Sequence, residues 1–104
     1  MATNHVGEGK TISFVAPTGG AVAGQPLALN DLVVVPLSGG PKGTPLTGVT
    51  GGEWRVAVEG ALKQGQKVSL LAGVLVAPAT PDAVPFGKLT SDAVGGFASA
   101  LLVQ

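Results

Sequence analysis

The sequence predicts an all-β protein, a small barrel or sandwich of short antiparallel strands with an extended N-terminal arm. Val-, Leu- and Ile-rich segments of strand length recur along the chain. Gly and Pro, with 17 and 8 occurrences, separate these segments at a spacing of roughly ten residues, which is typical of sandwiches and barrels. No segment sustains the apolar period of an amphipathic helix. The length of 104 residues favours one domain, so we expect an arm at 1–10 and a single β-domain at 11–104.

Four strands are expected in the first half of the chain. Residues 1–10 are polar and rich in small side chains, which is typical of an extended arm or of a first edge strand. The segment Lys10–Ala16 then alternates, with Ile12 and Phe14 on the same side. The further expected strands are Pro26–Leu29, Leu32–Leu37 and Leu46–Val49. The turns and loops between them are 17–24, 30–31 and 38–45, where Gly, Pro, Asn and Asp gather.

Five strands are expected in the second half. The clearest is Glu53–Glu59, in which Trp54, Val56 and Val58 share one face while the other face is mostly charged. A helix over Leu89–Leu102 competes with the last strand, but two consecutive glycines interrupt it at a cost of about 1 kcal/mol each. The other expected strands are Lys67–Leu71, Val74–Ala77, Phe86–Leu89 and Phe97–Gln104. The connections are a possible helical turn at 61–64, a hairpin turn at 72–73 and a stiff surface loop at 78–85.

One apolar phrase occurs twice. GQPLALNDLVVVP begins at Gly24 and GQKVSLLAGVLVAP begins at Gly65, an offset of 41 positions (65 minus 24). With this offset Leu29 matches Leu70, and Val33–Val35 matches Val74–Val76. We expect two similar hairpins, one in each half of the chain, which suits a barrel or sandwich with pseudo-twofold character. The alternative is a coincidence in a chain rich in Val, Leu and Gly.

Charge and composition limit the classes of partner. Six basic residues balance six acidic ones, and no basic patch is visible, so we expect no nucleic-acid partner. Charged residues make up only 12% of the chain, against an ordinary value near 25%, which favours self-association into a homo-oligomer. The N-terminus lacks the apolar core of a signal peptide, and the longest apolar run, Val68–Pro78, is too short for a transmembrane helix. We therefore expect a soluble protein without a membrane partner.

Residues suited to catalysis or metal binding are sparse. His5 is the only histidine and has no second ligand nearby, and the absence of cysteine excludes disulfides and thiolate metal sites. The serines lie outside nucleophile-elbow patterns, and the acidic residues are scattered singly. The glycine-rich segment 39–44 lacks the spacing of a phosphate-binding loop. We expect neither catalytic residues nor a metal or cofactor. Trp54 is either an exposed contact residue or an anchor of the core or of an interface, and its alternation with two valines favours the anchor.

Turn residues and apolar residues follow one another in a distinct order from the N-terminus onward. The N-terminal pattern consists of Asn4, Val6, Gly9, Ile12, Ala16, Pro17, Gly19, Gly20, Val22 and Gly24. A strand that ends in Val-Glu-Gly at 58–60, a Gly-Gln-Lys-Val segment at 65–68 and a final strand follow in order. In these features the chain resembles bacteriophage capsid cement (head decoration) proteins, and it departs from their pattern at 78–93.

The resemblance implies a non-enzymatic virion protein that binds the outside of an icosahedral phage head and stabilises the capsid lattice. Its implied partners are the major capsid protein and further copies of itself, as a dimer or trimer, on the capsid exterior after synthesis in the host cytoplasm. The residues implied to contact the capsid are Thr3, Asn4, His5, Val6, Glu8 and Lys10. The alternatives are a head–tail or tail accessory structural protein and, less favoured, a small ligand- or sugar-binding β-module.

Overall fold

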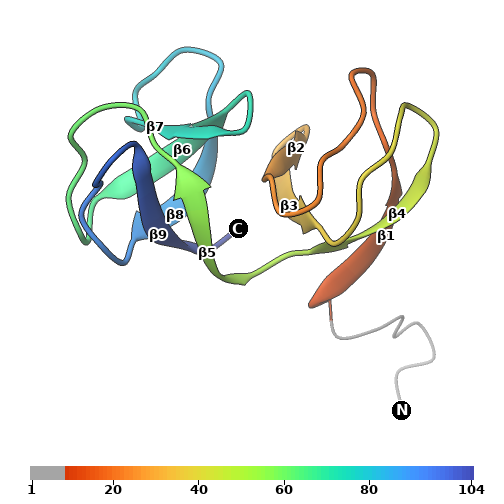
Figure 1. The fold of residues 1–104 in the computed structure, drawn as a ribbon, viewed down its shortest axis with the longest axis horizontal. Helices are drawn as coiled ribbons and strands as arrows, with labels where there is room; N and C mark the ends of the chain where they lie inside the picture. Colours follow the sequence, from red (N-terminus) through yellow and green to blue (C-terminus); the bar gives the residue numbers. More distant parts are fainter. Residues whose placement is uncertain (1–8) are drawn as a thin grey trace.

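The computed structural model describes residues 9–104, and within that range the chain is built from β-strands, turns and loops without a helix (Figure 1). Two antiparallel sheets form, one from each half of the chain. This confirms the predicted all-β class. Most of the predicted N-terminal arm, residues 1–8, lies outside the described residues.

The first sheet contains four strands in the order β1-β4-β3-β2. In chain order they are β1 (Thr11–Val15), β2 (Leu27–Leu29), β3 (Leu32–Pro36) and β4 (Pro45–Val49). The continuous apolar run of β3 fits its position, since Val33, Val34 and Val35 are all fully buried. Gly48 allows β4 to approach closely, because a Cβ atom there would lie 2.9 Å from the Val34 Cβ and 3.0 Å from the Phe14 ring.

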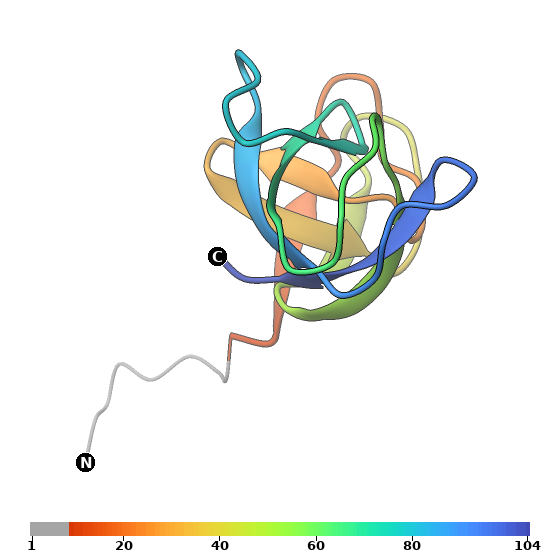
Figure 2. The ribbon, with the colours of Figure 1, turned by 90° about the vertical axis from the view of Figure 1, so that its left-hand side faces the viewer.

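The second sheet contains five strands in the order β5-β9-β8-β6-β7 and curls into a small barrel. In chain order they are β5 (Gly52–Ala57), β6 (Lys67–Leu71), β7 (Val74–Val76), β8 (Val84–Leu89) and β9 (Phe97–Leu102). A parallel bridge between Val58 and Leu75 joins the two outer strands, and the Glu59 N–H donates to the Leu75 carbonyl at 2.9 Å. The curled sheet lies on the left in Figure 1 and faces the viewer in Figure 2.

One apolar core connects the two sheets. Val33 and Val35 of the first sheet belong to the same buried cluster as the barrel residues. The barrel contributes Val56, Val58, Val68, Leu70, Leu75, Phe86, Leu89, Ala98, Ala100 and Leu102. The predicted alternation over 53–59 is confirmed, because Val56 of β5 and Val58 just after it lie in this cluster and Trp54 packs against it.

A β-bulge in β8 directs the largest fully buried side chain into this core. Val68 pairs with Gly87 and Ser69 with Pro85, so Phe86 between them has no partner on β6. Gly87 is required at this point, since a Cβ atom there would overlap the backbone oxygen of Leu101 on β9. The bulge therefore turns Phe86 inward.

Strand boundaries differ from the predictions at a few positions. The loop predicted over 78–85 is shorter, because β8 already begins at Val84. Pro85 is tolerated there since β9 pairs with β8 only from Gly87 onward, which leaves Pro85 at an edge. The last strand ends at Leu102, two residues before the predicted end. The possible helical turn at 61–64 is instead a turn over Lys63–Gln66, which the Gln66 side chain closes by accepting from the Lys63 N–H at 2.6 Å.

The repeated phrase forms two hairpins, one in each sheet, as predicted. Strands β2 and β3 flank Asn30-Asp31, and strands β6 and β7 flank Ala72-Gly73. The predicted match of their second strands is wrong by one residue. The hairpins are related by an offset of 42 positions (72 minus 30), because β6 has one more residue between the Gly-Gln pair and the turn. Val33 therefore corresponds to Leu75 and not to Val74.

Candidate functional site

Strand β1 presents an open edge of the first sheet. The Lys10 carbonyl accepts from the Thr50 N–H at 3.0 Å, and the Ala16 N–H donates to the Thr44 carbonyl at 2.9 Å. In an antiparallel ladder every second residue faces the same partner, so Ile12 and Phe14 also direct their backbone groups toward β4. The backbone N–H and C=O groups of the residues between them point away from the sheet. These outward residues are Thr11, Ser13 and Val15.

The two faces of β1 differ in side-chain character. Ile12 and Phe14 are half-buried on the face that also carries the buried Val34 and Leu46, which we call the inner face of this sheet. Thr11, Ser13 and Val15 are exposed on the opposite face, here called the outer face, which at β3 carries Val33 and Val35 of the shared core. Val15 is 59% exposed, and Leu37 beyond the end of β3 is 57% exposed. Both line a shallow hollow on the outer face of the sheet. The open edge thus lies beside apolar side chains that no other described residue covers fully.

The base of the N-terminal arm is fixed by Thr50. Its hydroxyl donates to the Gly9 carbonyl, and it also lies 3.3 Å from the Lys10 carbonyl. The backbone N–H of Thr50 also donates a hydrogen bond to the Lys10 carbonyl, at 3.0 Å. The backbone of Gly9 and Lys10 is therefore fixed at the corner of the first sheet where β1 and β4 meet.

Gln104 links this corner to the barrel. Its Oε1 accepts from the Val33 N–H at 3.1 Å, and its Nε2 donates to the Val33 carbonyl at 2.6 Å. The same Nε2 donates to the Thr50 carbonyl at 2.9 Å. The side-chain amide thus occupies the position of a neighbouring strand's peptide group beside β3, beyond the end of β4. It ties the segment that follows β9 to β3 and to Thr50, the residue directly after β4.

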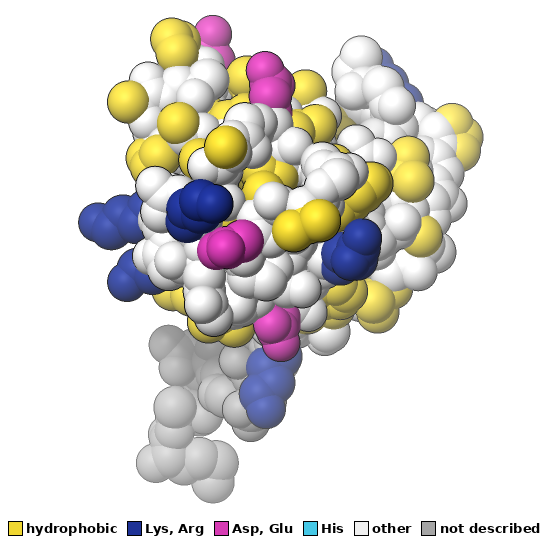
Figure 3. Space-filling model, turned by 60° about the vertical axis from the view of Figure 1, so that its left-hand side comes forward, with side chains coloured by type: hydrophobic (Ala, Val, Ile, Leu, Met, Phe, Trp, Pro, Cys, Tyr) yellow, Lys and Arg dark blue, Asp and Glu magenta, His cyan; other side chains and the backbone are white. Residues whose placement is uncertain are grey.

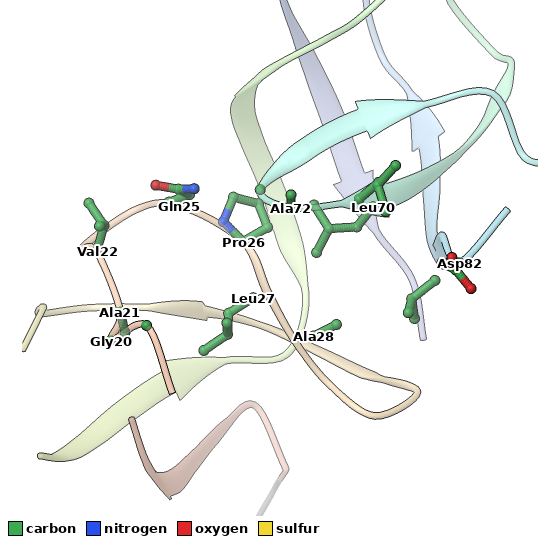
Figure 4. A pocket seen from close by; sticks show the side chains of 14 residues that line it. Gly20, Ala21, Val22, Gln25, Pro26, Leu27, Ala28, Leu70, Ala72 and Asp82 are labelled. Carbon is green, nitrogen blue, oxygen red and sulfur yellow. The ribbon is translucent and has the colours of Figure 1, made fainter. Parts of the chain in front are cut away.

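A groove of about 320 Å³ lies between the two hairpins (Figure 4). Its lining combines the first phrase, from Gln25 to Ala28, with the second, from Leu70 to Gly73. The two phrases meet here, since the Gln25 side chain lies directly over Gly73, where a Cβ atom would overlap it. Asp82 supplies the carboxylate of the lining, and its backbone is left-handed with φ 65°. The groove offers one amide, one carboxylate and a mainly apolar wall.

The outer face of the barrel carries charges of both signs, scattered among apolar side chains (Figure 3). Lys67 and Lys88 lie directly opposite each other on neighbouring strands. The Arg55 guanidinium lies 5.3 Å from the centroid of the Phe97 ring, a cation–π contact on the same face. Val94, at 75% exposure, lines a hollow with these two residues.

The aromatic side chains have separate roles. The Trp54 ring packs against the core while its Nε1 donates to the Gly51 carbonyl at 2.8 Å. Phe86 is fully buried and Phe14 half-buried. Phe97, at 45% exposure, is the one exposed aromatic in residues 9–104, and Arg55 covers one face of its ring.

The residues implied to contact a capsid are only partly placed. Thr3, Asn4, His5, Val6 and Glu8 lie outside the described residues. Lys10 is exposed and sits beside Thr50 at the base of the arm. Reasoning from the sequence missed Thr50 and Gln104. The first stood in an expected turn and the second at the end of an expected strand, and neither carries a local pattern that predicts such contacts.

Within residues 9–104, no three His, Cys, Asp or Glu side chains lie close enough together to hold a metal ion. No helix of this part of the chain is long and apolar enough to cross a membrane. Comparisons with protein-family models, with curated proteins and with solved structures found no match to this chain.

Proposed function

We propose that this chain is a structural protein of a bacteriophage virion that binds the outside of an icosahedral head and stabilises its lattice. The observation that carries the proposal is the N-terminal series of turn and apolar residues between Asn4 and Gly24, which resembles capsid cement proteins. In this proposal the partners are the major capsid protein and further copies of the chain. The protein resides on the capsid exterior after synthesis in the host cytoplasm.

The fixed base of the arm supports this role. A hydrogen-bonded attachment point limits the positions that an arm can reach, which lowers the entropy lost when the arm binds a capsid subunit. Thr50 holds the carbonyls of Gly9 and Lys10, and Gln104 joins Thr50 to the barrel. A protein that binds only the assembled lattice stabilises that lattice by mass action. Several arms in one oligomer add avidity.

The alternative of a sugar-binding module is less favoured by the described surface. Stacking against a sugar requires an exposed aromatic ring with a free face. Phe97 is the exposed aromatic, and Arg55 already lies over one side of it. Trp54, the other residue considered for this role, packs against the core. We therefore retain the structural role as the proposal.

Binding to purified phage heads tests the proposed function directly. Expanded heads without decoration are mixed with the protein, sedimented and assayed for bound chain and for heat-induced release of DNA. We expect saturable binding and a higher temperature of DNA release. Binding to isolated tails or head–tail connectors but not to heads supports the accessory-protein alternative and contradicts the proposal, as does binding to none of these.

A scrambled arm and a matched pair of lysine variants locate the contact. A chain in which residues 2–8 are scrambled keeps the length and composition of the arm, and we expect it to lose at least tenfold in affinity for heads. Lys10→Ala is compared with Lys42→Ala, because both lysines are exposed but only Lys10 lies at the base of the arm. A smaller loss for Lys10→Ala, with no loss for Lys42→Ala, is expected. Unchanged binding of the scrambled chain excludes the arm as the capsid contact.

A further inference from the structure

Within residues 9–104, the edge of β1 lacks the protection that the other sheet edges have. Strands β5 and β7 are joined through the bridge between Val58 and Leu75. Strand β2 has three residues and lines the groove that faces the barrel. Strand β1 is longer and contains no charged residue and no proline between Thr11 and Val15. Proteins normally block an exposed edge with such residues, with a bulge or with a covering segment, because an open edge pairs with other strands.

We propose that β1 is a self-association surface, on which a second copy of this chain adds its own β1 in antiparallel orientation about a twofold axis at Ser13. The inference deepens the homo-oligomer named in the proposed function, but it is tested without any phage component. Failure of β1 pairing leaves head binding standing, and failure of head binding leaves β1 pairing standing.

The backbone polarity of β1 fixes this register. Thr11, Ser13 and Val15 are the residues whose N–H and C=O groups point outward. An antiparallel pair centred on Ser13 places Thr11 of each copy opposite Val15 of the other, so every outward residue meets an outward residue. A shift by one residue places outward groups against inward ones, and a shift by two leaves one residue of each copy unpaired. The centred register forms six backbone hydrogen bonds and is the same for both copies, as a twofold interface requires.

The side chains of β1 are also compatible with pairing to the β1 of a second copy. In the centred register Ile12 of each copy lies opposite Phe14 of the other on the inner face, and both are only half-buried in the single chain. Cross-strand pairs of aromatic and β-branched side chains stabilise a sheet by roughly 0.2–1 kcal/mol each. Lys10 falls opposite Ala16, so no like charges oppose, and the chain has a net charge of zero. The backbone polarity, the length and the charge of the β1 edge therefore match those of the β1 edge of a second copy.

The interface is small, which sets the conditions of the test. One pair of short strands buries less than the roughly 1,200–2,000 Å² of a standard interface, so we expect dissociation in the micromolar range or weaker. Sedimentation equilibrium of the full chain between about 10 μM and 1 mM covers this range. The apparent mass is expected to rise from 10.1 kDa toward twice that value. A mass that stays at one chain throughout overturns the proposal.

Charge substitutions on the outer face of the first sheet identify the surface. Ser13→Lys places two ammonium groups opposite each other at the twofold axis, and we expect at least a tenfold weaker dimer. Thr47→Lys is the matched control, because Thr47 is exposed directly beside Ser13 but on β4, one strand from the edge. Mixing Ser13→Lys with Ser13→Glu is expected to restore the dimer as a heterodimer. Equal weakening by Thr47→Lys, or no rescue in the mixture, overturns the pairing.

Two further measurements exclude other modes of association. Amide exchange of Thr11, Ser13 and Val15 is expected to slow with rising protein concentration, while that of Ile12 changes little, since its N–H already faces β4. A chain without residues 2–8 is expected to dimerise as the full chain does. If that deletion abolishes association, or if Ser13→Lys leaves it unchanged, the association uses another surface and the proposal is wrong.

Discussion

The two sheets of this protein differ in whether their outer strands are paired. The second sheet curls until its outer strands meet at Val58 and Leu75, so its backbone groups are largely used within the barrel. The first sheet stays open, and β1 leaves three residues with outward backbone groups. Ten of the twelve residues of the buried cluster also belong to the barrel side. We therefore expect the barrel to contribute more to stability than the first sheet does, and the open edge of the first sheet to be the part that binds partners.

Truncation of matched phenylalanines tests this division most strongly. Phe86→Ala removes the largest buried side chain of the barrel, and we expect a loss of about 3–5 kcal/mol in the free energy of unfolding. Phe14→Ala in the first sheet is expected to cost roughly half as much, because Phe14 is only half-buried. Phe97→Ala, on the exposed face, serves as the control at about 0.5–1 kcal/mol. Urea unfolding at low protein concentration measures all three, and equal losses for Phe86 and Phe14 contradict the division.

Gln104→Glu tests the link between the barrel and the first sheet. A carboxylate lacks the N–H groups that serve the carbonyls of Val33 and Thr50, so we expect a loss of about 1–3 kcal/mol. Gln66→Glu is the matched control. Its side-chain oxygen accepts from the Lys63 N–H, a bond that a carboxylate retains, and the change is expected to be nearly neutral. Thermal unfolding measures the difference, and equal stability of the two variants shows that the link contributes little.

The smallest effect concerns the turns of the two hairpins. Ala72 is left-handed with φ 51°, a conformation that costs alanine more than asparagine, and the corresponding residue of the other hairpin is Asn30 with φ 58°. We expect Ala72→Asn to stabilise the protein by about 0.5–1 kcal/mol and Asn30→Ala to destabilise it by a similar amount. Both positions are exposed, so packing changes little. Denaturant midpoints check the opposite signs, and shifts in the same direction exclude this explanation.

Local patterns were sufficient to predict most of the strands. Alternation along β5, the Gly and Pro loops and both hairpin turns are properties of neighbouring residues, and they correspond to the structure. The bulge at Phe86 was not predicted, because it depends on the joint register of β8 with β6 and β9. The meeting of Val58 with Leu75 is likewise a property of the whole curled sheet.

Local sequence patterns predicted less of the candidate site than of the strands. The sequence marked Lys10–Ala16 as a strand, but whether a strand lies at an edge depends on the order of the sheet, which alternation does not encode. The bonds of Gln104 join side chain to backbone across distant segments and leave no trace in local composition. The role of Thr3, Asn4, His5, Val6, Glu8 and Lys10 as capsid contacts came from the resemblance to cement proteins. It stays a prediction that the head-binding experiment tests.

The amide of Gln104 has a consequence for the order of folding. It bonds to Val33, which lies 71 positions earlier in the chain. Closing so long a loop costs chain entropy, and this cost falls only when the intervening strands have already shortened the path. We therefore expect the barrel and the first sheet to form before this bond closes. In that order of folding, Gln104 joins two pre-formed parts and is not the nucleus from which they grow.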